Sequence, residues 1–304
     1  MSILLNLDHF KSYLNSKKLS PLTIKSYILD IKHFLEFDDF LNNVQNLKIQ
    51  DFRRYISHKK QNNIKPSSIS RCISAIKAFY KMLKKYEICN NDEILKFTSP
   101  KLPKTLPKAL TIEEVMDLFL YDTVEDDGGQ NWENQRNKAI ITLIYSTGLR
   151  ISEALSLKKR DYINNSDFIK VLGKGNKERV VPLVGRAKNE INKYLKISPI
   201  PLLADYPLFI KDKRNNETSK PIALSIREFQ KIMQNIRTTK NLPKFATPHA
   251  LRHSFATHII SKGGDIRSVQ SLLGHSSLST TQKYVKVDEE VLKEAYNKFH
   301  NFKI

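Results

Sequence analysis

Cysteine and long apolar runs are scarce in this sequence, and each scarcity excludes a class of protein. Two cysteines, Cys72 and Cys89, are too few for a disulfide scaffold, so we expect reduced thiols in or near a core. No apolar run approaches the roughly 18 residues that cross a membrane. The first six residues lack both the basic and the long apolar region of a signal peptide. We therefore expect a cytoplasmic globular protein.

Acidic residues are also few, with 31 against 51 lysines and arginines, and the formal net charge is +20. The first 104 residues carry +10 and the other 200 carry +10, so positive charge is about twice as dense in the first third. This excess favours a polyanionic partner, either nucleic acid or an anionic membrane surface. A lysine-rich composition that serves solubility alone gives the same balance.

Apolar residues in the first third recur at three- and four-residue steps, which is the spacing of an amphipathic helix. The clearest patterns run from Pro21 to Leu35 and from Ser67 to Leu83. Shorter helices are expected over residues 7–14 and 49–57. Four helices with basic faces predict a small all-α domain over residues 1–98.

A proline-rich stretch follows this domain. Residues 99–110 carry three prolines separated by lysines, and prolines at this spacing cannot continue a helix. They favour an extended, semi-rigid linker. We therefore place the second domain at residues 111–304.

The second domain combines helices with a small antiparallel β-sheet. Strands over residues 167–172 and 179–183 are joined by a turn rich in glycine and asparagine, which predicts a hairpin, and residues 208–210 suggest a further short strand. Helices are expected over residues 111–120, 134–146, 225–237, 265–273 and 288–299. The expected fold class is mainly α with a small antiparallel β-sheet, in which an N-terminal helical domain precedes a C-terminal α+β domain.

Residues 247–284 hold the side chains best suited to chemistry. Thr247 and Pro248 suit the start of a helix, which places His249 in its first turn and Arg252 three residues later on the same face. An imidazole and a guanidinium at a helix N-terminus make a seat for a phosphate group.

Three motifs resemble the signature of the tyrosine site-specific recombinases, especially the bacterial and archaeal Xer type. They are T-G-L-R-I-S-E at 147–153, H-A-L-R-H-S-F-A-T-H from 249, and L-L-G-H-S-S-L-S-T-T-Q-K-Y, which ends at 284. Their order and spacing are similar to those of the family, and the resemblance covers nearly the whole chain. It implies a SAM-like core-binding domain that grips DNA, followed by a catalytic tyrosine-recombinase domain.

Cutting a phosphodiester requires cationic donors on its two non-bridging oxygens, a positioned nucleophile, and a proton for the leaving oxygen. Arg150 and Arg252 suit the first task, because a guanidinium stays protonated and offers a planar fork of donors. His249 suits the acceptor of a phenolic proton, and the donor in the reverse step.

The resemblance implies roles for the other candidate residues. Tyr284 is the expected nucleophile, and Lys174 is the expected general acid for the 5′-oxygen, with Lys177 as the alternative. His275 is expected to hydrogen-bond the scissile phosphate. Glu153 is similar to the family's carboxylate that orients the site.

No metal or other cofactor is expected. His249 and His253 stand four residues apart, as zinc ligands can, but Ala250 replaces the glutamate of the H-E-x-x-H motif and no third ligand is evident. His253 and His258 are therefore expected to be structural. A phosphotyrosyl ester also keeps the energy of the broken bond, so religation needs no ATP.

The function implied is cleavage and rejoining of DNA through a 3′-phosphotyrosyl intermediate, as in Xer-type chromosome dimer resolution at a dif-like site. A mobile-element integrase, a type IB topoisomerase and a non-catalytic DNA-binding protein of the same fold are the alternatives. The family exchanges strands in homo- or heterotetramers on two DNA sites, with the C-terminal helix, here residues 288–299, docking in a neighbouring subunit. A septal DNA translocase is a further candidate partner.

Overall fold

The computed structural model describes residues 3–38, 40, 44–97, 108–120, 131–162, 166–173, 178–183, 185–211 and 220–261. The chain divides into two compact units, Met1–Thr105 and Leu106–Ile304. Each unit has its own hydrophobic core, so each is described by itself. Within the described residues, no helix is long and apolar enough to cross a membrane.

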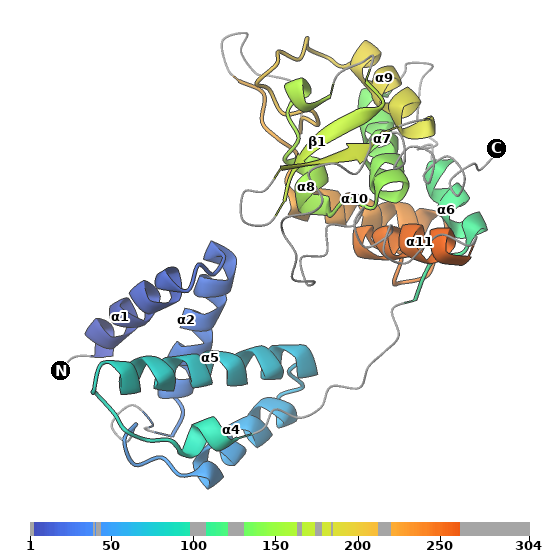
Figure 1. The fold of residues 1–304 in the computed structure, drawn as a ribbon. Helices are drawn as coiled ribbons and strands as arrows, with labels where there is room; N and C mark the ends of the chain where they lie inside the picture. The colour runs from blue at the N-terminus through green and yellow to red at the C-terminus, as the bar shows by residue number, and fades with distance from the viewer. Residues whose placement is uncertain are drawn as a thin grey trace. The chain divides into compact units, whose positions relative to one another are not determined.

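The first unit is helical, as its apolar spacing predicts (Figure 1). Its elements are α1 (Ile3–Ser16), α2 (Pro21–Leu35), α4 (Ile49–Gln61), α5 (Pro66–Lys85) and the short 3-10 helix η1 (Glu93–Lys96). The α2 helix begins where the sequence indicates, because the Ser20 hydroxyl accepts a hydrogen bond from the Thr23 backbone N–H at 3.1 Å. All four predicted helices are confirmed, and α1 and α4 are longer than expected.

Aromatic side chains from α1, α2, α4 and α5 fill the core of the first unit. Phe34 of α2 is fully buried, and its ring lies 5.6 Å from Phe52 and 5.3 Å from Tyr55, both on α4. Pairs of this kind add about 0.5–1.5 kcal/mol each beyond the area they bury. The two cysteines are buried and unpaired, as predicted.

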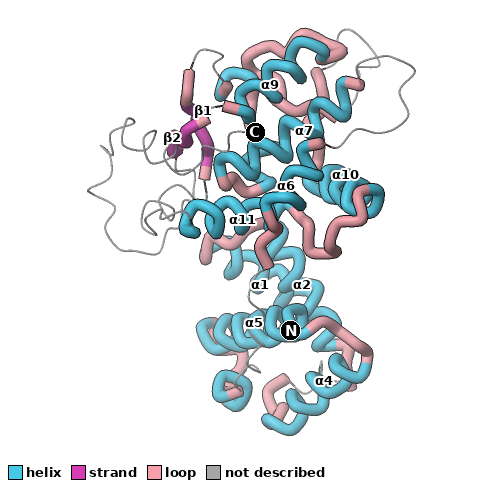
Figure 2. Tube along the Cα trace, turned by 90° about the vertical axis from the view of Figure 1, so that its right-hand side faces the viewer, coloured by secondary structure: helices cyan, strands magenta, loops and turns pink. Residues whose placement is uncertain are grey.

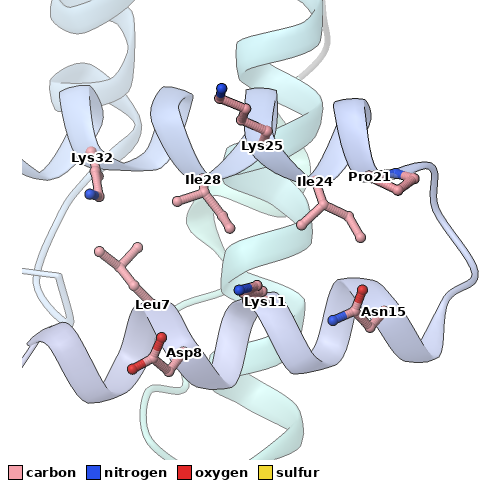
Figure 3. Close-up of a pocket in the computed structure, with 9 residues that line it drawn as sticks. All are labelled: Leu7, Asp8, Lys11, Asn15, Pro21, Ile24, Lys25, Ile28 and Lys32. Atoms are coloured by element: carbon pink, nitrogen blue, oxygen red, sulfur yellow. The ribbon is translucent and has the colours of Figure 1, made fainter. Parts of the chain in front are cut away.

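Helices α1 and α2 leave a groove between them, of about 460 Å³ (Figure 3). Leu7, Ile24 and Ile28 form its apolar part, and Figure 3 shows their side chains directed into the space between the two helices. Lys11 and Lys25 also line the groove. The basic character that the sequence predicts for these helices therefore extends into this groove.

The second unit combines helices with one hairpin among its described residues, which confirms the expected fold class (Figure 2). Its helices are α6 (Ile112–Phe119), α7 (Trp132–Thr147), α8 (Ile151–Leu155), η2 (Lys159–Asp161), α9 (Arg186–Ile197), α10 (Ile226–Thr239) and α11 (Pro248–Ser261). Its strands are β1 (Phe168–Leu172) and β2 (Glu178–Pro182).

Helix α7 is the centre of this unit. Buried residues, all apolar except Thr142, cover its whole circumference from Ala139 to Tyr145, and α6, α8, α9 and α11 all pack against it. Leu110, at the end of the predicted linker, is buried in the same core, and its backbone N–H donates to the Ser254 hydroxyl at 2.8 Å. Because α7 is held on several sides, the position of its C-terminus, and so of the residues that follow it, is fixed.

The hairpin has the predicted strands. β1 and β2 pair antiparallel from Phe168 opposite Pro182 to Leu172 opposite Glu178. Ile169, Val171 and Val181 point into the core, so register and burial agree. The two ends of the turn are thereby fixed, whereas residues 174–177 lie outside the described part of the chain.

One sequence expectation for this unit is corrected, and two helices, α8 and α9, were not predicted. Residues 208–210 form no strand: isolated bridges lie at Pro207 and Ile210, and the backbone bonds between them go to different neighbours. The Leu208 N–H donates to the Leu157 carbonyl, while the Phe209 carbonyl accepts from the Leu224 N–H. Helix α9 was not expected, although its buried Ala187, Ile191 and Tyr194 carry a helical spacing. The helices expected at 265–273 and 288–299 lie outside the described residues.

Candidate active site

Gly148 ends α7 and turns the chain toward the site. It adopts a left-handed conformation, φ 65° and ψ 19°, and its N–H donates to the Ile144 carbonyl at 2.9 Å. Glycine takes this conformation without the steric penalty that a Cβ brings. Leu149 is then fully buried, and Arg150 follows as the residue that precedes α8. In the T-G-L-R sequence, the glycine thus ends the helix, the leucine is buried in the core, and the arginine is placed at the site.

Helix α11 delivers the second arginine. It starts at Pro248, as predicted, and the Thr247 hydroxyl accepts a hydrogen bond from the Ala250 N–H at 3.2 Å. One turn later the Arg252 Nη1 donates to the Gly148 carbonyl at 2.6 Å. Gly148 therefore connects the two motifs, because its N–H caps α7 and its carbonyl holds Arg252.

Glu153 holds the guanidinium groups in place. Its side chain is only 6% exposed. It accepts from the Arg150 backbone N–H at 2.9 Å and from Arg150 Nη1 at 2.9 Å. Arg179 of β2 donates to both of its oxygens, from Nη1 at 3.1 Å and from Nη2 at 2.9 Å, and Arg252 Nη1 lies 3.9 Å from Oε2.

These contacts set the protonation states of the cluster. Burial raises the pKa of the Glu153 carboxyl, but hydrogen bonds from Arg179 and the Arg150 backbone outweigh it and lower that pKa to about 2. Burial lowers the pKa of Arg252 to about 10, with Arg150 and Arg179 acting in the same direction and Glu153 against them. At neutral pH, three arginines and one carboxylate leave a net charge of +2.

A cavity of about 450 Å³ lies beside this cluster. Arg150, Ser152, His249 and Arg252 contribute polar groups to its wall. The Arg150 side chain is 42% exposed and the Arg252 side chain 9%, so one guanidinium meets solvent while the other is set deep in the wall. A cavity with this charge and these donors is suited to a bound anion with several oxygens, such as a phosphate diester.

The structure brings together four of the predicted site residues. Arg150, His249 and Arg252 line the cavity, and Glu153 is hydrogen-bonded to the first of them. The other four candidates, Lys174, Lys177, His275 and Tyr284, lie outside the described residues.

The two other histidines of α11, His253 and His258, differ from each other in their surroundings. The His258 Nδ1 lies 3.0 Å from the Tyr145 hydroxyl, and the imidazole packs against that ring. His253 also lines the cavity, and its Nε2 lies 3.5 Å from the Thr257 hydroxyl. Within the described part of the chain, no three His, Cys, Asp or Glu side chains gather as metal ligands would.

Sequence reasoning missed one residue of this cluster, Arg179. Its signal is weak, because it is a basic residue at an alternate position of a short strand that already contains Glu178 and Val180. Only the packing of β2 beside α8 brings it to Glu153.

Comparison with known proteins agrees with these features. Residues 109–290 match the phage integrase family, and residues 7–87 match the phage integrase N-terminal SAM-like domain. The chain is 41% identical over 288 residues to tyrosine recombinase XerC of Rickettsia prowazekii (strain Madrid E), covering 92% of this chain and 91% of the relative. It is 40% identical over 302 residues to tyrosine recombinase XerC of Rickettsia bellii (strain RML369-C), covering 97% and 96%.

A solved structure supports the fold. A crystal structure of a lambda integrase (75-356) dimer bound to a COC′ core site is similar with a TM-score of 0.68 and 15% identity, covering 94% of this chain and all of that one. The family match spans more than half of the chain, and the relatives are about 40% identical over more than nine-tenths of it. The chain therefore belongs to the phage integrase family and is a tyrosine recombinase of the Xer type, an enzyme that breaks and rejoins DNA.

Proposed function

We propose that the chain recombines DNA at a short specific site through a 3′-phosphotyrosyl intermediate, and that it resolves chromosome dimers at a dif-like sequence. The observation that carries this proposal is the convergence of Arg150, Arg252 and His249 on one cavity. The biological role is supported by the identity of about 40% to tyrosine recombinases named XerC over nearly their whole length.

In this proposal the two arginines bind the non-bridging oxygens of the scissile phosphate. Arg150 is partly exposed and Arg252 is held by the Gly148 carbonyl, so the second needs little reorganisation when an anion arrives. The excess of two positive charges matches the charge that builds on the phosphate as the nucleophile approaches. A preorganised donor that is buried in the cavity wall, as Arg252 is, stabilises that charge more than an exposed donor would.

Tyr284 attacks phosphorus, so a bond forms between its phenolic oxygen and phosphorus while the bond from phosphorus to the 5′-oxygen breaks. His249 accepts the phenolic proton, and Lys174, or Lys177 as the alternative, gives a proton to the leaving 5′-oxygen. His275 donates a hydrogen bond to the phosphate. The roles of Tyr284, the two lysines and His275 rest on the sequence motifs.

Rejoining reverses these steps on a second strand. The 5′-hydroxyl attacks phosphorus and gives its proton to the neutral amine of Lys174, or of Lys177 as the alternative. The bond from phosphorus to the phenolic oxygen breaks, and His249 returns a proton to that oxygen. Because the ester retains the energy of the original bond, this chemistry needs neither ATP nor a metal ion.

Double-stranded DNA is the proposed partner, gripped in part by the first unit. Lys25 and Lys32 of α2 and Lys81 of α5 are exposed, which supports contact with phosphates. Four subunits on two sites are proposed for strand exchange, with residues 288–299 docking in a neighbour. A second recombinase and a septal DNA translocase are candidate partners in that assembly. A chromosomal substrate in a bacterium would place the reaction in the cytoplasm.

The test is a covalent-adduct assay. A suicide substrate carrying the dif-like site of the same genome should trap wild-type protein on DNA. The Tyr284→Phe variant should bind the same DNA without forming the adduct, while Tyr206→Phe, a matched tyrosine variant, should behave as wild type. Equal DNA retention by all three proteins without an adduct would instead indicate the non-catalytic DNA-binding protein. Adducts on mobile-element ends alone would indicate an integrase.

A further inference from the structure

Arg179 occupies an unusual position for a residue with no assigned role. It lies on β2, its side chain is 19% exposed, and both of its Nη groups donate to Glu153. Its remaining donor, Nε, is buried and has no hydrogen-bond partner among the described residues. An unpaired buried donor is destabilising. The side chain therefore adopts a conformation that favours the two bonds to Glu153 at the expense of hydrogen bonding at its own Nε.

Electrostatics also argue against a purely structural role. Arg179 is a third cation beside Arg150 and Arg252, and its charge is one of the causes that lower the pKa of Arg252. A tie between β2 and α8 could be made without adding a cation next to two others. The charge of Arg179 therefore acts directly on the Arg252 guanidinium.

We propose that Arg179 is a positioning residue, which occupies both oxygens of Glu153 and so keeps that carboxylate, which already holds Arg150, from also drawing Arg252 away from the DNA phosphate. This inference rests on the proposed function of those two arginines. Glu153 Oε2 already lies 3.9 Å from Arg252 Nη1, so a small rotation of an unclamped carboxylate would form a direct pair. That pair would occupy a donor that Arg252 needs for phosphate, and the loss of Arg179 would itself reduce the net charge of the cluster from +2 to +1.

The clamp, by which we mean Arg179 bonded to both oxygens of Glu153, has a defined set of charged neighbours. Among the described residues, Glu153 receives hydrogen bonds from Arg150 at its own helix start and from Arg179 on β2, with Arg252 of α11 nearby. Removing Arg179 takes away the strongest influence that lowers the pKa of Glu153, so the carboxyl should protonate at a higher pH than in the wild type.

The experiment compares Arg179→Met and Arg179→Lys with wild type, each with and without Glu153→Gln. Arg160→Met is the matched control, because it removes an arginine of the same unit that pairs with Asp205 at the surface at 2.6 Å. Single-turnover adduct formation on a suicide substrate is measured from pH 5 to pH 8, together with DNA affinity and thermal unfolding.

Arg179→Met should slow adduct formation about 100-fold at unchanged DNA affinity, the size expected when a reacting group is misplaced by about 1 Å. Part of this loss should be recovered at acid pH, because protonation of the unclamped Glu153 carboxyl removes its attraction for Arg252. Arg179→Lys keeps the charge but not the two-pronged geometry, and should lose about 10-fold. In the Glu153→Gln background, Arg179→Met should cause little further loss and show no recovery at acid pH.

A structural tie alone would give a different pattern: Arg179→Met would lower the unfolding temperature while folded protein reacted at the wild-type rate, which overturns the inference. If the Met variant does not fold, the Lys variant decides, and a wild-type rate for it also overturns the inference. If wild-type protein forms no adduct on any DNA, the proposed function itself fails. The positioning role of Arg179 is then tested by the rise in unfolding temperature that inorganic phosphate causes. The inference is supported if Arg179→Met loses this rise, and it is overturned if Arg179→Met and Arg160→Met retain it equally.

Discussion

Replacing Glu153 by glutamine should destabilise the second unit in a way that depends on pH. The pKa of this buried carboxyl is lowered from 4.5 to about 2, which corresponds to roughly 3 kcal/mol of stability at neutral pH. Because the pKa is lower in the folded protein, this contribution is complete above about pH 5 and is lost as the pH falls toward 2. The Glu153→Gln variant lacks it at every pH.

The assay can be confined to the second unit, because the single tryptophan of the chain is Trp132, at the start of α7. Its ring lies 5.1 Å from the Arg136 guanidinium, so its fluorescence should change when α7 unfolds. At pH 7 the Glu153→Gln variant should unfold roughly 6–12 °C below wild type, the shift expected for a domain of this size. The difference should shrink as the buffer is taken from pH 5 to pH 3.

Asp205→Asn is the matched control, because Asp205 also pairs with an arginine but its side chain is 71% exposed. A surface pair of this kind contributes at most about 1 kcal/mol. Equal unfolding temperatures for wild type and Glu153→Gln at pH 7 would refute the reasoning. So would a difference that stays constant between pH 7 and pH 3, because the carboxylate would then not be the charged centre of the cluster.

Three further experiments test the turn at Gly148, an ion pair in the first unit, and the contacts with DNA phosphates. Gly148→Ala should cost about 1 kcal/mol of the same Trp132-monitored stability, because φ is 65° at this position, and should slow adduct formation by displacing Arg150; an unaltered rate would contradict the placement of the guanidinium by this turn. Arg71→Met should destabilise the first unit by about 2 kcal/mol, measured by circular dichroism, because it removes a two-pronged pair with buried Asp30 at 2.8 and 3.2 Å, and Asp30→Asn should recover part of the loss. DNA affinity should fall with salt with a logarithmic slope of about −0.9 per neutralised phosphate, and Arg150→Met should make that slope shallower by about one such increment; a flat response would exclude phosphate contacts.

The sequence predicted the elements whose signal is local. Helix α2 has a Ser-Pro start and a regular apolar stripe, and α11 begins at Thr247 and Pro248 as its capping residues indicate. The β1–β2 hairpin follows from two β-rich runs around a turn rich in glycine and asparagine. In each case the residues that decide the conformation lie within a few positions of one another, so no knowledge of the rest of the chain is needed.

Elements that depend on distant partners were harder to predict. The segment at 208–210 has the apolar composition of a strand, but its backbone groups bond to Leu157 on one side and Leu224 on the other, so no ladder forms. Helix α9 has a helical spacing, but it follows Gly185 without a side-chain cap and has no acidic residue in its first turn, so little in the local sequence marks its start. What decides these segments is the position of α7, against which α9 packs.

The active-site cluster shows the same division between local and distant information. Arg150 and Glu153 are three residues apart, so their pairing at the start of α8 follows from helix geometry. The contact between Arg252 and the Gly148 carbonyl joins residues 104 positions apart, and that between Arg179 and Glu153 joins residues 26 positions apart. A motif comparison points to the first of these, because both residues belong to motifs. It is silent on the second, because Arg179 belongs to none of the three motifs, and only the contact between β2 and α8 gives that arginine its partner.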